Sequence, residues 1–191
     1  MRVYRPVRTN LIRQTFGLKG TAISMLPLYN KLGYKAHSGF DFAVNCKDSF
    51  IKHGGQCESI YNSIIGTGDL TVTLIQKDDE KGYGIIALDE VWNKFYFWHF
   101  DIIDPLIYVG RKLKLGDLLG TAGNTGVSTG AHLHLEYHPY NEDVNNGFFG
   151  AEDFEPFYDN RFCLDIKSQI LIIQKLIEIY QTIINIIKCK T

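Results

Sequence analysis

The chain has 191 residues, of which 45% are hydrophobic and 21% charged, and its formal net charge is −1. This length suits one domain with an appendage and a substantial core, and the composition is that of a soluble globular protein. The balanced charge, without a dense basic patch, argues against nucleic-acid binding. The sequence has no apolar run long enough to span a membrane, and no signal peptide is visible after the N-terminal arginines.

Short runs rich in β-branched and aromatic residues predict a series of strands along most of the chain. Residues 21–36 are predicted to be irregular, because Pro27 and Gly33 interrupt them. Regular short strands with few helices indicate a mainly β fold, built as an antiparallel β-sheet or sandwich. The predicted strands are Leu11–Phe16, Phe40–Val44, Ser59–Ile65, Leu70–Gln76, Gly84–Glu90, Lys94–Phe100, Leu118–Ala122 and His132–Tyr137.

The pattern changes near residue 165, after which apolar residues recur at helical spacing. Ser168–Lys188 is predicted to be one amphipathic α-helix with an unusually wide apolar face. Packing on the β domain, homo-oligomerisation and docking onto a larger assembly are alternatives for this face. We therefore expect a domain over residues 1–160 and a C-terminal helix over 165–190.

The cysteines lack the spacing of a four-cysteine zinc site. Cys46 and Cys57 lie near the two ends of a polar insertion over residues 45–58, and an oxidising environment would allow a local disulfide between them. Free thiols packed as small apolar groups are the alternative.

Residues 123–134 form the most informative stretch, in which a loop of small residues leads into two histidines separated by one leucine. Because side chains alternate along a strand, His132 and His134 are predicted to project from one face. Leu133 and Leu135 would then point the other way, into a core. Two imidazoles on one face of a strand indicate a metal or acid–base site.

The remaining polar residues around this motif have more than one interpretation. Glu136 lies on the same strand face and is either a partner of an imidazole or exposed to solvent. His138, before Pro139, and His53, in the polar insertion, are predicted to be surface residues. His99 lies among aromatic residues, a context that taken alone favours a buried, hydrogen-bonded core histidine.

A second segment, His37-Ser38-Gly39-Phe40-Asp41, places a histidine and an aspartate at a turn that enters a strand. These residue types bind zinc through nitrogen and oxygen. Together with His134 they give three protein ligands and leave the fourth tetrahedral position for water, which is the arrangement of a catalytic zinc site.

These segments together resemble the lysostaphin-like, LytM-type zinc endopeptidases that cut peptidoglycan peptides. The resemblance covers about residues 11–140 in order, including His37-x-x-x-Asp41, the aromatic segment with His99, Gly116-Asp117 and residues 123–134. It implies a mostly antiparallel β domain with a narrow catalytic groove whose floor carries the metal.

The resemblance also implies a role for each residue of the motif. His37, Asp41 and His134 would bind one Zn²⁺ per chain, and His132 and His99 match the two non-ligand active-site histidines of the family. We expect His132 to accept a proton from the attacking water and His99 to hydrogen-bond the water or the tetrahedral intermediate, although these two roles are exchangeable.

A substrate groove is expected around this metal site. Some family members place a tyrosine a few residues before the first ligand, for which Tyr34 and Tyr29 are both candidates. The glycines of the loop permit close approach of an extended peptide. The predicted groove residues are Tyr34, Asn124, Thr125, Ser128 and Thr129.

The expected function is a zinc-dependent endopeptidase that hydrolyses cross-bridge or stem peptides of bacterial peptidoglycan. Because no signal peptide is visible, we expect a phage endolysin or virion-associated protein that acts on the bacterial cell wall. A non-catalytic wall-binding or regulatory protein, or a virion structural protein that carries this domain, is the alternative.

Overall fold

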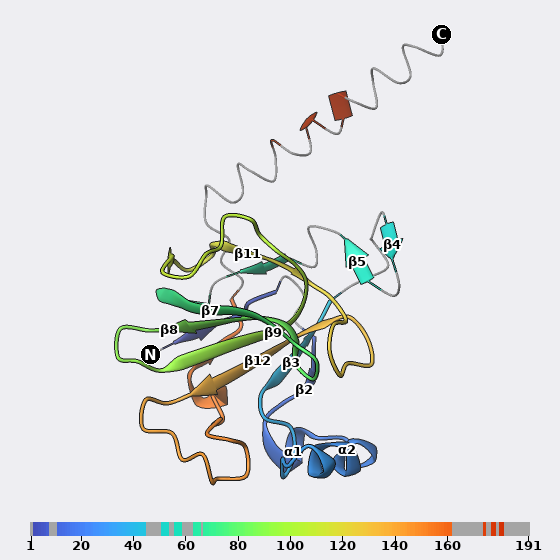
Figure 1. Cartoon of the computed structure of the whole chain (residues 1–191), viewed down its shortest axis with the longest axis vertical. Helices are drawn as coiled ribbons and strands as arrows, with labels where there is room; N and C mark the ends of the chain where they lie inside the picture. The colour runs from blue at the N-terminus through green and yellow to red at the C-terminus, as the bar shows by residue number, and fades with distance from the viewer. Residues whose placement is uncertain are drawn as a thin grey trace.

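The computed structural model describes residues 2–7, 11–44, 51–53, 56–58, 63–65, 67–161, 174, 177–178 and 180–181. Figure 1 shows several long strands side by side, with the short helices α1 and α2 beyond one end of them. In chain order the elements are β1 (Val3–Tyr4), β2 (Ile12–Gln14), α1 (Gly17–Gly20), η1 (Ile23–Met25), α2 (Leu26–Lys31), β3 (Phe40–Ala43), β4 (Ile51–His53), β5 (Gln56–Glu58), β6 (Ser63–Ile65), β7 (Leu70–Asp78), β8 (Gly82–Leu88), β9 (Lys94–Ile103), β10 (Lys112–Leu113), β11 (Leu118–Ala122), β12 (His132–His138), η4 (Glu155–Phe157) and β13 (Tyr158–Asp159).

One large sheet contains nine strands of the described residues, in the order β10-β7-β8-β9-β12-β3-β2, with β11 pairing with both β9 and β6. Each of these pairs is antiparallel. The structure therefore confirms the prediction of a mainly β fold with an antiparallel sheet.

The alternation predicted for the last strand of this sheet is also confirmed. In β12, Leu133 and Leu135 are fully buried and Tyr137 is 8% exposed, so these side chains enter the core. Neighbouring strands contribute Phe42 and Phe97, which are likewise fully buried. The opposite face of β12 remains available for the histidines.

The sequence predicted residues 21–36 to be irregular, but the structure shows helical segments there. They include η1 and α2, and α1 precedes them. Pro27 lies in the first turn of α2, where its missing N–H costs nothing and its fixed φ favours a helix. Gly33 follows the helix with a φ of +88°, which ends the helix in the left-handed conformation. The prediction was wrong because it took an N-terminal proline as a breaker.

The two ends of the domain meet in a short parallel ladder, in which β1 pairs with β13. Val3 and Phe154 beside this ladder are 1% exposed, and Phe154 stacks on Phe40 of β3 with ring centroids 4.2 Å apart. These strands were not predicted from the sequence, because two residues are too few to show a periodic pattern.

Several predictions fall on residues outside the described part of the chain. The structure does not describe Cys46 or the side chain of Cys57, so the disulfide prediction lies outside it, as does the exposure of His53. The same holds for the 165–190 helix, except that the described residues at 174, 177–178 and 180–181 are helical and exposed. Among the described residues, we find no helix with the length and apolar character to cross a membrane.

Truncation of a core phenylalanine should measure how far this sheet depends on its packing. Phe97→Ala should lower the free energy of unfolding by about 3–5 kcal/mol, because a large buried ring is replaced by a cavity. Urea denaturation would measure this change. Leu106→Ala, at a side chain that is 62% exposed, should change it by less than about 0.5 kcal/mol. Equal effects of the two substitutions would contradict the core assignment.

Candidate metal centre and groove

Two neighbouring strands carry two of the three predicted metal ligands. The antiparallel register of β3 and β12 places Asp41 directly opposite His134. His37 lies just before β3, where its backbone bridges to Gly17 and its N–H donates to Thr21 Oγ1 at 3.0 Å. Strand pairing thus brings together residues that are distant in the sequence.

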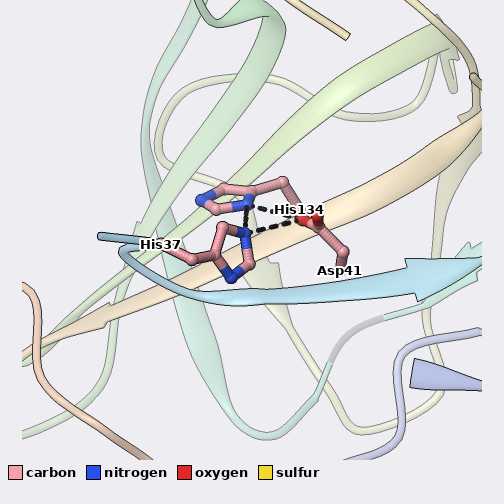
Figure 2. Close-up of side chains that lie close together, drawn as sticks. All are labelled: His37, Asp41 and His134. Atoms are coloured by element: carbon pink, nitrogen blue, oxygen red, sulfur yellow. Dashed lines mark hydrogen bonds and ion pairs between the residues drawn. The ribbon is translucent and has the colours of Figure 1, made fainter. Parts of the chain in front are cut away.

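The three side chains converge on one point, as Figure 2 shows. Nε2 of His37 lies 3.0 Å from Asp41 Oδ1 and 3.0 Å from His134 Nδ1. Nδ1 of His134 lies 2.8 Å from the same Asp41 oxygen. All three residues are buried, and their donor atoms are close enough to hold one metal ion together.

Hydrogen bonds on the outer side of each ring set which nitrogen faces this point. His37 Nδ1 lies 3.0 Å from the Thr15 carbonyl oxygen, and His134 Nε2 lies 2.9 Å from Glu136 Oε1. Because both partners are acceptors, each outer nitrogen carries a proton, and in a neutral ring the inner nitrogen then presents a lone pair. Two imidazole lone pairs and a carboxylate therefore face one another, and a bound cation would relieve their mutual repulsion. This donor set fits a zinc ion.

Protons compete with a metal for the same lone pairs. Burial lowers the pKa of His134, but hydrogen bonds with Asp41 and Glu136 outweigh it and leave that pKa raised. Burial would raise the pKa of Asp41, whereas the neighbouring His37 and hydrogen bonds from His132 and His134 hold it well below the usual range. Asp41 thus remains an anion, and metal binding at this site would release protons.

Two further histidines lie beside the three candidate ligands. Nε2 of His132 is 3.4 Å from Asp41 Oδ1, while its Nδ1 is 2.7 Å from the Gly130 carbonyl oxygen. The ring of His99 lies 4.6 Å from that of His132 between centroids, and its Nδ1 is 2.7 Å from the Thr125 carbonyl oxygen. Since both Nδ1 atoms donate to carbonyls, the Nε2 atom of each ring is an acceptor when that ring is neutral.

His99 reaches this face of the sheet through a β-bulge. The pairing of β8 with β9 shifts between Tyr83–Phe100 and Gly84–Trp98, which leaves His99 without a cross-strand partner in that pairing. Its φ is +67°, in the left-handed region that costs a residue other than glycine about 1–3 kcal/mol. The bulge directs the imidazole of His99 toward His132. Regular alternation would instead place it on the face of the sheet opposite to that of Trp98.

The electrostatic surroundings of His99 keep it neutral. Burial lowers its pKa to about 3, and the nearby imidazoles of His132 and His134 act in the same direction. The ring is therefore uncharged at neutral pH and a weak proton acceptor.

A cavity of about 270 Å³ opens over the candidate ligands. Of the predicted groove residues, Tyr34, Ser128 and Thr129 line it, but Asn124 and Thr125 do not. Thr125 instead orients the His99 ring, because its carbonyl accepts a hydrogen bond from His99 Nδ1. Its own position is fixed by its hydroxyl, which donates to the Phe100 carbonyl at 2.9 Å.

The helical segment before His37 supplies one wall of the cavity. Met25, Leu28 and Leu32 from this segment line it, as does Tyr29. The Tyr29 ring lies 5.8 Å from that of His37 between centroids, and burial together with Asp41 raises the pKa of its hydroxyl to about 12. Both candidate tyrosines therefore lie at the cavity, Tyr29 against a ligand and Tyr34 farther along the wall.

The prediction that His138 is a surface residue was wrong. It is 5% exposed, with Nδ1 2.7 Å from Glu142 Oε2 and Nε2 3.3 Å from Glu136 Oε2. It is the third residue of the polar row that begins at His134, and the neighbouring side chains cover the whole row. Glu136 is likewise buried and contacts the imidazole of His134. Of its two interpretations, the structure supports the partner of an imidazole and contradicts exposure to solvent.

Sequence reasoning missed three polar residues that contact this site. Gln14 donates to Asp41 Oδ2 at 3.0 Å, Ser38 donates to Glu136 Oε1 at 2.7 Å, and Lys81 donates to the same Glu136 oxygen at 2.8 Å. Ser38 lies inside the quoted motif and could have been noticed there. Gln14 and Lys81 carry no local signal, because strand pairing brings Gln14 close and the packing of a turn against a loop brings Lys81 close.

Comparisons with known proteins agree with this arrangement. An uncharacterized metalloprotease of Haemophilus influenzae is 45% identical over 111 residues, which cover 58% of this chain and 20% of that protein. An uncharacterized metalloprotease of Buchnera aphidicola is 45% identical over 40 residues, which cover 21% of this chain and 11% of that protein. The chain thus spans a fifth or less of the length of these curated relatives.

The fold also resembles a solved structure. Helicobacter pylori Csd3 superposes with a TM-score of 0.54 over 98% of this chain and 42% of that one, at 17% identity, which shows a shared fold alone. The sequence matches peptidase family M23 over residues 35–146, more than half of the chain and a range that contains the three candidate ligands, His99 and His132. The chain therefore belongs to peptidase family M23.

Proposed function

We propose that this chain is a zinc-dependent endopeptidase that hydrolyses cross-bridge or stem peptides of bacterial peptidoglycan. The observation that supports this most is the convergence of two imidazole lone pairs and a carboxylate oxygen within 3.0 Å of one another, beside two more imidazoles. Such a three-ligand set leaves a coordination position open, as catalytic rather than structural zinc sites do.

The chemistry divides among the side chains of the site. A zinc ion bound by His37, Asp41 and His134 would lower the pKa of water to about 7 and polarise the scissile carbonyl. His132 accepts the proton of the attacking water at Nε2, since its Nδ1 proton is held by the Gly130 carbonyl, and later delivers it to the leaving amine.

His99 has a different task from His132. Its low pKa makes it a poor base, so it orients the attacking water by accepting a hydrogen bond at Nε2. The Thr125 carbonyl fixes the ring for this task. The burial of His99 and its lowered pKa support this division of roles, because the outer hydrogen bond is of the same kind in both rings.

The shape of the cavity supports an extended peptide as the substrate. Met25, Leu28 and Leu32 form one wall, and Ser128 and Thr129 from the loop before β12 form another. A cleft between two such walls would exclude water from the reacting bond while the substrate backbone lies along it.

Removal of the metal tests this proposal. Protein stripped by a chelator should release no fragments from purified peptidoglycan, and one equivalent of zinc should restore hydrolysis, as measured by mass spectrometry of the released peptides. Exposed peptide bonds in an unrelated unfolded protein serve as the specificity control. Equal hydrolysis with and without metal, or no fragments from the zinc-loaded protein, would overturn the proposal.

A further inference from the structure

The carboxylate of Glu136 links the candidate metal site to the rest of the molecule. Its Oε1 accepts from three donors: Ser38 Oγ at 2.7 Å, Lys81 Nζ at 2.8 Å and His134 Nε2 at 2.9 Å. Its Oε2 faces His138. Glu136 is 4% exposed, so these contacts replace the water that would otherwise solvate its charge. The direction of the His134 ring depends on where this carboxylate is held.

Among these donors, Lys81 is a permanently charged one. Burial lowers the pKa of Lys81, but the Glu136 carboxylate outweighs this effect and leaves that pKa raised. The Lys81 side chain is 26% exposed, and its ammonium lies 4.8 Å from the centre of the Tyr34 ring. Every hydrogen bond to the Glu136 carboxylate is charge-assisted, and that of Lys81 is in addition an ion pair with a permanently charged donor, so the ammonium contributes strongly to fixing this carboxylate.

The backbone that carries Lys81 is held in place against the loop of the active-site motif. The Lys81 N–H donates to Asp78 Oδ1 at 2.6 Å, and the carbonyl of Glu80 accepts from Val127 at 2.6 Å. At Gly126, whose φ is +72°, an added Cβ would lie 2.4 Å from the Gly82 nitrogen, so the turn and the loop are in close contact. The lysine therefore approaches Glu136 from a fixed turn rather than from a free surface.

We propose that Lys81 is a positioning residue of the metal site: it holds the Glu136 carboxylate that keeps Nδ1 of His134 directed at His37 and Asp41. This inference rests on the proposed function, because it concerns the presentation of a metal ligand. Lys81 lines the same cavity as the candidate ligands, and its effect on His134 passes through Glu136, to which it donates.

Zinc affinity and the state of the His134 ring both test this role. Lys81→Met should weaken zinc binding about 10-fold, at the lower end of the effect of removing outer partners of metal ligands. Chelator competition would measure the affinity. In the metal-free protein, ¹⁵N NMR of the labelled imidazole should show the Nε2–H form of His134 in the wild type and a mixture of forms in the variant. Lys81→Arg, which keeps the charge and the donors, should recover both properties.

A double-mutant comparison separates this role from a general structural one. In a Glu136→Ala background, Lys81→Met should change zinc affinity by less than about 2-fold, because its route to His134 is gone. Lys114→Met is the matched control: it removes an exposed lysine paired with Asp69 and should leave zinc affinity and the His134 signal unchanged. If Lys81→Met does not fold, Lys81→Gln takes its place in the same comparison.

The outcomes are distinct. Wild-type zinc affinity in Lys81→Met, or an equal loss in the Glu136→Ala background, would overturn the positioning role while leaving the proposed function intact. A wild-type protein that binds no zinc would instead refute the proposed function itself.

Discussion

Replacement of Asp41 by asparagine should remove high-affinity zinc binding and, with it, the hydrolysis of peptidoglycan. Asp41 is the anion among the three candidate ligands, and its Oδ1 faces both ring nitrogens at 2.8–3.0 Å. An amide of the same shape keeps the packing but loses the charge. We expect a loss of affinity beyond the 10–100-fold that is typical of outer partners.

Thermal unfolding provides a readout of this variant that does not depend on catalysis. At a zinc concentration about 1,000 times the dissociation constant, the wild type should gain about 4 kcal/mol of stability. The same zinc concentration should stabilise Asp41→Asn far less. Asp69→Asn removes an exposed carboxylate and should behave as the wild type does. Undiminished stabilisation of Asp41→Asn by zinc would place the metal site elsewhere.

Replacement of His132 by alanine should slow hydrolysis while leaving zinc bound. His132 lies outside the ligand set, and its Nε2 is 3.4 Å from Asp41 Oδ1. Loss of a general base typically costs about 10²–10⁴-fold in rate. The kcat on a defined peptidoglycan fragment, measured with zinc content determined in parallel, checks this expectation.

The companion variant His99→Ala tests how the two histidines divide their roles. A larger fall in kcat for His132→Ala supports His132 as the base, and a larger fall for His99→Ala would exchange the two assignments. Full activity of His132→Ala with zinc bound would contradict a catalytic role for this residue.

The sequence was sufficient to predict those parts of the site that follow from strict strand alternation. His132 and His134 share a face of β12, with Leu133 buried behind them, because the side chains of an extended chain alternate. The sheet class followed for the same reason, since the central strands β7, β8, β9 and β12 have seven to ten residues and are long enough to show their composition. His37 and Asp41 joined the set through their residue types and then through the resemblance, and strand pairing explains why Asp41 lies close to His134.

Residues whose position depends on a departure from regular geometry could not be placed from the sequence. Alternation would direct His99 to the wrong face, and only the bulge with its positive φ brings the ring to the site. Lys81 lies in a turn whose position depends on loop packing. The burial of His138 depends on Glu142, which returns to β12 from the following loop. These are tertiary effects without a local signature.

The ladder between β1 and β13 determines which piece of this protein can be transplanted as a working unit. Phe40 and Asp41 are consecutive in β3, so the phenylalanine that stacks on Phe154 and the aspartate of the site project from opposite sides of one strand. A fragment trimmed to the matched range 35–146 would lack Phe154, and the Phe40 side of β3 would then be exposed to solvent. A chimaera that borrows this chemistry therefore has to import residues 3–159, including both short terminal strands.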